Sequence, residues 1–334
     1  MKYLVTGAAG FVGSHLCELL RVEGDEVIAT DNVNDYYSAD LKNLRIDYFL
    51  VKKEIEFIKG DLSDLSFVRK LIAKYSPDCV IHLAGQAGIR IAIADSYKYV
   101  NDNLVSFCNV AQVIKENAIP LFLYASSSSV YGNSANIPYK ESDLEIQPIS
   151  IYGATKKANE ILASVYALNS ATRTRGMRFF TVYGPWGRPD MAYFRLIESA
   201  LNGSKFKMLG NGDIKRDFTF IDDNVRMIKL LAEQLTDAKG GYSDIVNIGG
   251  GKPRSLIDLV HEIERQTGKA INIEILRKNP NDTILTCADV EYSKNLSKGF
   301  IPEVELEIGI RKCLEWAKQS TIKENLRQWI ESTV

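Results

Sequence analysis

Short, almost wholly apolar runs alternate with longer amphipathic segments through the first 180 residues. Runs of this kind are typical of strands buried on both faces, and the longer segments carry apolar residues at helical spacing. The expected strands are KYLVTG, EVIAT, EIEFIKGD, DCVIHLAG, IPLFLYASS and GMRFFTVYG, and the expected helices span 11–23, 41–50, 65–75, 100–116 and 151–168. Regular strand–helix alternation predicts an α/β fold built on a doubly wound parallel sheet.

The pattern changes after residue 180. A turn-rich stretch, YGPWGRPDM, precedes an expected helix at 193–202, and GNGD marks a later turn. FTFIDD and the helix after it, then DIVNIGGG, are expected to rejoin the first part. We therefore predict a nucleotide-binding domain over 1–180 plus about 217–250, and a smaller α/β substrate domain over about 181–216 plus 251–334. The ligand is expected in the cleft between them.

Composition limits the partners. The 334 residues carry 41 basic and 42 acidic side chains and no long basic block, so neither nucleic acid nor a membrane is an expected partner. No segment reaches the roughly 18 apolar residues of a membrane span. Five scattered cysteines without metal-type spacing favour a reducing compartment and no metal site. We expect a cytoplasmic protein that binds small molecules or a second copy of itself.

A glycine-rich loop follows the first expected strand. Gly7, Gly10 and Gly13 form a GxxGxxG pattern that leads through Phe11 and Val12 into a helix. Small residues here let backbone N–H groups approach a pyrophosphate at the positive end of the helix dipole. We assign these five residues to a dinucleotide cofactor in a Rossmann-type domain, the alternative being a merely tight turn.

The end of the second expected strand carries Asp31, where a carboxylate would accept hydrogen bonds from an adenosine ribose. A carboxylate repels a 2′-phosphate, so NAD is favoured over NADP. Further cofactor candidates follow the strand ends, with loop geometry as their alternative role: Asn32, Asp61, Leu62, Leu83, Ala84 and Gly85.

Tyr152 and Lys156 lie four residues apart, hence one turn apart on the same face of an expected helix. A nearby ammonium lowers a tyrosine pKa from its ordinary value of about 10, which suits proton transfer near neutral pH. The YxxxK pattern alone is common. Because this pattern follows a nucleotide loop and the serine run of YASSSSVYG, it favours a catalytic role for the pair.

Together these motifs resemble the extended, sugar-nucleotide-modifying branch of the short-chain dehydrogenase/reductase family. The matching segments, in family order, are TGAAGFVGSHL, DLSD, HLAGQAG, SSSSVYG, YGATKKANE, RFFTVYGP, KRDFTFIDD and VNIGGG. The resemblance implies that Tyr152 is the catalytic acid/base, that Lys156 tunes it and holds the nicotinamide ribose, and that Ser127 hydrogen-bonds the reacting sugar oxygen. It also implies a homodimer formed through the helices at 100–116 and 151–168, the alternative being that their extra apolar residues belong to a deeper core.

The residues before VYG indicate the reaction class. Family dehydratases and decarboxylases carry acidic residues there, where this chain has Ser128 and Ser129. Redox-only chemistry is therefore favoured. A net reductase would need an exchangeable cofactor, usually NADPH, whereas Asp31 points to NAD. What remains is epimerisation with a tightly bound NAD that is regenerated in each turnover.

Four segments are similar to bacterial and plant UDP-glucuronate 4-epimerases: GIR at 88–90, NDYYSADLKNLR at 34–45, SSSSVYG at 126–132 and, above all, RFFTVYGPWGRPDM at 178–191. The 4-keto form of a uronic acid is a β-keto acid, which loses carbon dioxide if its carboxylate aligns with the ketone. An epimerase must therefore hold that carboxylate, and Ser128, Thr181 and Arg188 are suited to do so. The alternative for Arg188 is a loop arginine paired with Asp190.

Three more substrate-binding candidates come from position and resemblance. Arg90 follows the fourth expected strand, Arg216 matches the family's diphosphate-binding arginine, and Asp282 matches an acid near the uridine ribose. Asn279 and Asn281 depart from the usual QPGD pattern there. The leading hypothesis is NAD-dependent conversion of UDP-glucuronate to UDP-galacturonate. The alternatives are a 4-epimerase of a neutral or N-acetylated UDP-hexose and a non-catalytic NAD-binding protein.

Overall fold

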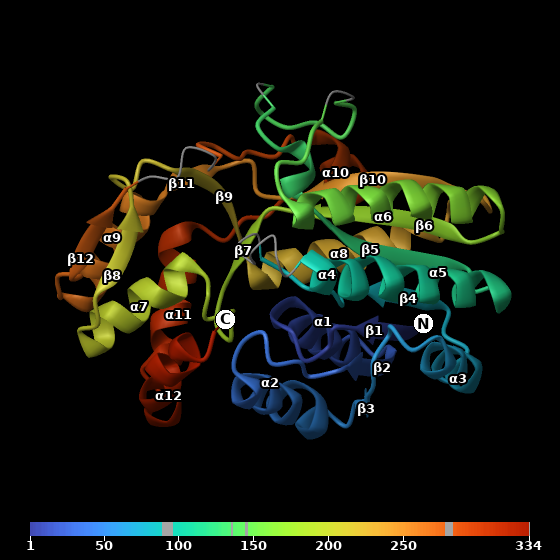
Figure 1. Cartoon of the computed structure of the whole chain (residues 1–334), viewed down its shortest axis with the longest axis horizontal. Helices are drawn as coiled ribbons and strands as arrows, with labels where there is room; N and C mark the ends of the chain where they lie inside the picture. The colour runs from blue at the N-terminus through green and yellow to red at the C-terminus, as the bar shows by residue number, and fades with distance from the viewer. Residues whose placement is uncertain (89–95, 135, 144–145, 278–282, 334) are drawn as a thin grey trace.

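The computed structural model describes residues 1–88, 96–134, 136–143, 146–277 and 283–333. Its centre is a seven-stranded sheet in the order β10-β6-β5-β4-β1-β2-β3, and every neighbouring pair is parallel (Figure 1). The strands are β1 (Lys2–Thr6), β2 (Glu26–Asp31), β3 (Glu56–Lys59), β4 (Cys79–His82), β5 (Leu121–Ser127), β6 (Arg173–Phe179) and β10 (Ser243–Ile248). The predicted doubly wound parallel sheet is confirmed.

Helices cover both faces of this sheet. Successive strand residues point to opposite faces, so Leu4 and Val80 enter one apolar cluster while Val5 and Ile81 enter another. The first cluster packs under α3 (Leu65–Tyr75) and α5 (Ser106–Glu116), with α6 (Ile151–Leu168) beside α5. The second packs under α1 (Phe11–Val22) and α8 (Ile221–Leu235), which lie against each other.

Short helical turns extend two of the predicted helices. After α2 (Ala39–Arg45) the chain continues through a π-helical turn, η1 (Ile46–Leu50), and a 3₁₀ turn, η2 (Val51–Lys53). Likewise α4 (Ser96–Tyr99) and the π-helical turn η4 (Val100–Val105) lead directly into α5. A 3₁₀ turn, η5 (Ser128–Tyr131), follows β5 and contains the last two of the four consecutive serines, while the first two end β5.

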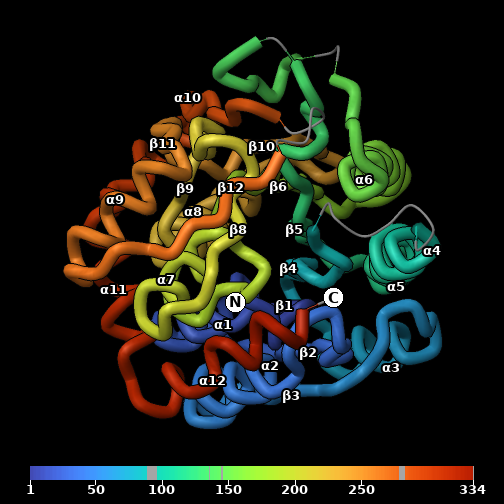
Figure 2. The backbone as a smooth tube through the Cα atoms, turned by 60° about the vertical axis from the view of Figure 1, so that its left-hand side comes forward, coloured from blue at the N-terminus to red at the C-terminus, as the bar shows by residue number. Residues whose placement is uncertain are grey.

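The remaining elements form a smaller lobe beside the sheet (Figures 1 and 2). Its strands are β7 (Thr181–Tyr183), β9 (Lys215–Phe220) and β11 (Pro253–Ser255) in one sheet, and β8 (Phe206–Leu209) with β12 (Ile273–Leu276) in another. Its helices include α7 (Ala192–Asn202), α9 (Leu256–Thr267), α11 (Leu306–Ala317) and α12 (Ser320–Glu331), while α10 (Glu291–Leu296) packs on β10 and α8.

One strand lies in a different sheet from the one expected. The segment KRDFTF forms β9, which pairs with β7 and β11 and not with the large sheet. Only α8 and β10 return to the first part, as their packing on α1 and pairing with β6 show. The apolar residues of this short strand do not specify a sheet, and its place is decided by pairing with strands distant in sequence.

The two parts share one apolar core. The cluster that contains Val5 and Ile81 of the large sheet also contains Phe194, Trp316 and Trp329 of the smaller lobe. Among the described residues, no helix is long and apolar enough to cross a membrane.

Candidate active site

The glycine loop lies where β1 meets α1, at the carboxyl edge of the sheet. Gly7 has a φ of +71°, and a Cβ on it would lie 2.6 Å from the backbone nitrogen of Ala84. A Cβ on Gly13 would lie 2.2 Å from the carbonyl oxygen of Gly7. Gly10 precedes α1 and has no side chain to cap the helix. The first-turn N–H groups of α1 are thus left for an external anion, an arrangement that fits a pyrophosphate.

Asp31 ends β2 beside this loop. Its Oδ2 accepts a hydrogen bond from the backbone N–H of Ala9 at 3.1 Å, and its Oδ1 accepts one from Val33 at 2.7 Å. A carboxylate offers about four acceptor positions, so ribose hydroxyls can still donate to it. Asn32, next to it, accepts from the N–H of Asn34 at 3.1 Å.

The segment after β4 connects the glycine loop to α6. Ala84 lies against Gly7, as the Cβ test shows, and follows Leu83, which hydrogen-bonds through its N–H to the carbonyl of Thr6. A Cβ on Gly85 would lie 2.7 Å from Oδ1 of Asn103 and 3.4 Å from Nζ of Lys156. These candidates are therefore brought next to both the loop and the ammonium.

The candidates after β3 have other contacts. Asp61 is exposed and its Oδ1 accepts the N–H of Ser63 at 2.8 Å. Leu62 is buried in the apolar cluster under α3, and its carbonyl accepts Nδ2 of Asn109 at 2.9 Å. Such contacts are expected if Asp61 and Leu62 shape the loop, which is the alternative to contact with the cofactor.

The tyrosine, lysine and serine candidates meet at the junction of β5 and α6. Ser150 caps α6 by accepting the N–H of Gly153 at 3.0 Å, which places Tyr152 in the first helical turn. Nζ of Lys156 lies 5.9 Å from the centroid of the Tyr152 ring, and burial lowers the pKa of this lysine to about 8. Oγ of Ser127 accepts the N–H of Ser129 at 3.1 Å, so its own proton is left to donate.

The environment of Tyr152 sets its proton affinity. Burial raises the pKa of the phenol above its ordinary value, while the hydrogen bond with Ser127 and the positive charge of Arg188 lower it. The sequence assigned this lowering to Lys156. In the structure, Ser127 and Arg188 are the groups that lower the pKa of Tyr152 against the effect of burial.

Arg188 lies between a carboxylate and the candidate site. Its Nε donates to Oδ1 of Asp190 at 3.0 Å and its Nη2 donates to Oδ2. The same guanidinium lies 3.8 Å from the position of a Cβ on Gly88, and its charge acts on Tyr152. Arg188 thus forms the ion pair with Asp190 that was the alternative role, and its positive charge also lowers the pKa of Tyr152.

The other substrate candidates are placed less centrally. Thr181 begins β7 and Ser128 begins η5, and both are partly buried. Arg216 lies in β9 and its Nη1 donates to the carbonyl of Lys215 at 2.9 Å. Arg90 and Asp282 lie outside the described residues. No group of three metal-ligating side chains is found in the part of the chain that the structure describes.

Two residues at the site carried no signal that singled them out in the sequence. Asn103 accepts the N–H of Gln86 at 2.7 Å and donates to Oγ1 of Thr155 at 3.1 Å, which ties the β4 loop to α6. Arg45 hydrogen-bonds to the backbone on both sides of the site. Both lie in helices, where spacing alone does not distinguish such residues from ordinary helix positions.

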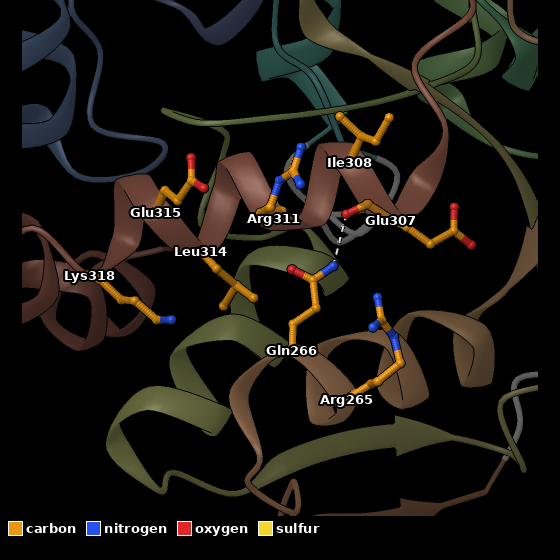
Figure 3. A pocket seen from close by; sticks show the side chains of 8 residues that line it. All are labelled: Arg265, Gln266, Glu307, Ile308, Arg311, Leu314, Glu315 and Lys318. Atoms are coloured by element: carbon orange, nitrogen blue, oxygen red, sulfur yellow. Dashed lines mark hydrogen bonds between the residues drawn. The ribbon is translucent and has the colours of Figure 1, made fainter.

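A separate hollow lies between α9 and α11 (Figure 3). Charged side chains line it, including Arg265 and Arg311, and Nε2 of Gln266 donates to the carbonyl of Glu307 across it at 2.8 Å. None of the predicted site residues lines this hollow.

Comparison with known proteins agrees with this geometry. Residues 3–249 match the sequence model of the NAD dependent epimerase/dehydratase family. The chain belongs to this family.

Two curated relatives cover almost the whole chain. Protein CapI of Staphylococcus aureus is 37% identical over 330 residues, which cover 95% of this chain and 98% of the relative. UDP-glucuronate 4-epimerase 4 of Arabidopsis thaliana is 39% identical over 326 residues, which cover 94% of this chain and 74% of the relative.

A solved structure is also similar to this chain over almost its whole length. UDP-glucuronic acid 4-epimerase from Bacillus cereus, in complex with UDP-glucuronic acid and NAD, superposes with a TM-score of 0.87 at 34% sequence identity. The match covers 96% of this chain and 99% of that one. The predicted family is thereby confirmed.

Proposed function

We propose that this chain interconverts UDP-glucuronate and UDP-galacturonate by epimerisation at C4, with NAD retained in the site. The observation that carries the substrate class is the guanidinium of Arg188, whose pair with Asp190 uses two of its five N–H donors and whose charge lowers the pKa of Tyr152. A cation beside the acid/base group is suited to a sugar that carries a carboxylate. The names of the Arabidopsis and Bacillus relatives support the same activity.

The residues present fit a bound NAD. The N–H groups at the start of α1 would hold the pyrophosphate, Asp31 the adenosine ribose, and Lys156 the nicotinamide ribose. When bound, NAD supplies a reversible acceptor for the hydrogen on C4. Glycine at positions 7 and 13 lets this loop pack tightly, because a Cβ at either position would collide with backbone atoms.

Tyr152 moves the proton in this proposal. As phenolate, its Oη accepts the proton of the sugar 4-OH, and the same phenol later returns a proton to the oxygen on C4. Ser127 assists because its Oγ already accepts the Ser129 N–H, which leaves its proton to donate to that oxygen or to the phenolate. The sugar turns over between the two transfers, so the configuration at C4 changes and nothing is consumed.

Arg188 has to keep the carboxylate from leaving as carbon dioxide. Its pair with Asp190 takes two of the five N–H donors of the guanidinium, and a carboxylate needs two more. Hydrogen bonds of this charged kind contribute about 1.5–3 kcal/mol each. Ser128 and Ser129 follow β5 without a carboxylate that would assist elimination.

The wider setting belongs to the same proposal. We propose the two-domain division given above, with the UDP-sugar bound between the parts, and a homodimer formed through η4, α5 and α6. We also propose a reducing, cytoplasmic location, with which the five free cysteines are consistent.

One observation favours the alternative substrate class. Because Asp190 already neutralises Arg188, a neutral UDP-hexose would meet no uncompensated cation. Replacing Arg188 by Ala discriminates: we expect kcat/KM to fall more for UDP-glucuronate than for UDP-glucose. Equal losses would assign Arg188 to loop structure alone.

Incubation of the purified protein with UDP-glucuronate, followed by NMR of the products, tests the proposed function directly. UDP-galacturonate is the expected product. Conversion of UDP-glucose without conversion of UDP-glucuronate would establish the neutral-hexose alternative, and carbon dioxide with a UDP-pentose would establish a decarboxylase. No conversion of any UDP-sugar would favour a non-catalytic NAD-binding protein.

A further inference from the structure

Arg45, at the end of α2, is fully buried and uses all of its donors. Nε and Nη2 both donate to the carbonyl of Trp186, at 2.9 and 2.6 Å, and Nη2 also donates to the carbonyl of Gly187 at 2.9 Å. Nη1 donates to the carbonyl of Ala9 at 3.2 Å and to the hydroxyl of Tyr37 at 2.6 Å. A guanidinium has five N–H groups, so each one has an acceptor.

These acceptors belong to two loops with different tasks. Ala9 lies in the glycine loop, between Gly7 and Gly10, whereas Trp186 and Gly187 directly precede Arg188. Among the described residues no carboxylate forms an ion pair with Arg45. The Arg45 side chain therefore joins the glycine loop to the loop that carries Arg188 through directional hydrogen bonds.

The backbone at Trp186 and Gly187, just before Arg188, is held in place by these hydrogen bonds. Trp186 has a φ of +61°, a conformation that costs free energy in a residue with a β-carbon. Its ring is fixed against Tyr48 and Trp316, and its carbonyl receives two N–H groups of Arg45. A Cβ on Gly187 would lie 1.5 Å from Oη of Tyr193, so glycine is required there. The loop is thus held in one arrangement immediately before Arg188.

We propose that Arg45 is a positioning residue for substrate specificity: it sets Arg188 relative to the bound cofactor, so that a uronate carboxylate is held and its loss is suppressed. The inference rests on the proposed function. A lysine cannot replace it, because a single ammonium has three donors on one atom and lacks the planar fork that reaches several carbonyls at once.

If Arg188 is displaced, the expected side reaction is loss of the sugar carboxylate as carbon dioxide. In a 4-keto uronate whose carboxylate is free to align, the C5–C6 bond breaks and C6 leaves as carbon dioxide. The electron pair of the bond remains on C5 as an enolate, which takes a proton. The ratio of carbon dioxide released to UDP-galacturonate formed therefore measures how well the site restrains the carboxylate. This ratio does not depend on the overall activity.

The experiment compares the purified NAD-bound wild type with Arg45→Lys and Tyr37→Phe. It measures kcat and KM for UDP-glucuronate and UDP-glucose, carbon dioxide release, NAD content and Tm. For Arg45→Lys we expect the ratio of kcat/KM values, uronate over glucose, to fall about tenfold or more, as for the loss of one hydrogen bond to a charged group. Carbon dioxide release should rise. Tyr37→Phe removes one acceptor only and should lower the ratio about two- to fivefold, a part of the same effect.

Arg175→Lys is the matched control. Arg175 is also fully buried and donates to Asp244, to the carbonyl of Leu231 and to Gln234, on the α8 side of the sheet. We expect it to lower Tm without changing the specificity ratio or carbon dioxide release.

The outcomes separate the two proposals. An unchanged ratio in Arg45→Lys, with only a lowered Tm as in the control, would show a purely structural role and overturn the inference. If Arg45→Lys does not fold, Tyr37→Phe decides, and an unchanged ratio there overturns it. Failure of the wild type to convert UDP-glucuronate would remove the proposed function itself, and the inference with it.

Discussion

The four consecutive serines after β5 have separate partners. Ser126 donates to Oε1 of Glu160 at 2.7 Å and anchors α6, whereas Ser127 accepts the backbone N–H of Ser129 and bonds to Tyr152. Ser128 is partly buried at the start of η5. A shift of one residue along this run would therefore exchange the hydroxyl that anchors α6 for the candidate catalytic hydroxyl.

Replacing Tyr152 by Phe should lower kcat by at least about 100-fold, because the proton acceptor is lost. The ring and its packing against Tyr99 remain, so NAD should be retained. Turnover of UDP-glucuronate and the NAD content of the purified variant measure both effects. Near-normal turnover would exclude Tyr152 as the acid/base group.

Ser127→Ala should move the acidic limb of the kcat–pH profile to higher pH. The hydrogen bond with Ser127 lowers the pKa of Tyr152 against the effect of burial, so its loss raises that pKa. Because the phenolate is the active form, a higher pH is then needed to populate it. Profiles of kcat against pH for both proteins measure the shift, and a limb that stays in place or moves to lower pH would contradict the assignment.

At the scale of elements, a buried ion pair holds α6 on the sheet. Arg178 of β6 donates to both carboxylate oxygens of Glu160 at 2.8 and 2.9 Å, and both side chains are about 1% exposed. Glu160 follows Tyr152 and Lys156 at intervals of one turn along α6. The pair therefore fixes the helix that carries the candidate catalytic residues.

Glu160→Gln should lower the free energy of unfolding by about 3 kcal/mol, because it leaves the buried Arg178 cation without its countercharge. The control is Glu116→Gln, whose ion pair with Arg69 is exposed and should contribute less than about 1 kcal/mol. Urea unfolding measures both variants. Equal effects of the two substitutions would show that the buried pair does not anchor α6.

Strands and helices of the first part could be predicted because apolar runs and helical spacing are local signals. Sheet membership is not local: KRDFTF is equally suited to the large sheet, and only pairing with β7 and β11 decides its place. The contacts of Arg45 show the same limit. Its acceptor Trp186 is 141 residues away, so no spacing rule joins them.

At the scale of the whole molecule, α6 carries exposed apolar side chains that the shared core does not cover. Ile161, Val165 and Leu168 lie on one side of α6 at helical spacing and are 57%, 52% and 79% exposed. Val105, just before the neighbouring α5, is 40% exposed. Contiguous exposed apolar side chains of this kind mark interaction surfaces, and they support the proposed homodimer.

Val165→Asp should convert the proposed dimer to a monomer, because a carboxylate on this face would be buried at the proposed interface without a partner. Val22→Asp is the control, since Val22 is 69% exposed at the end of α1, on the other side of the sheet. Sedimentation equilibrium measures the mass of both variants. If the wild type dimerises and Val165→Asp stays dimeric, the interface lies elsewhere. If Val22→Asp dissociates while Val165→Asp does not, the α1 side carries it instead.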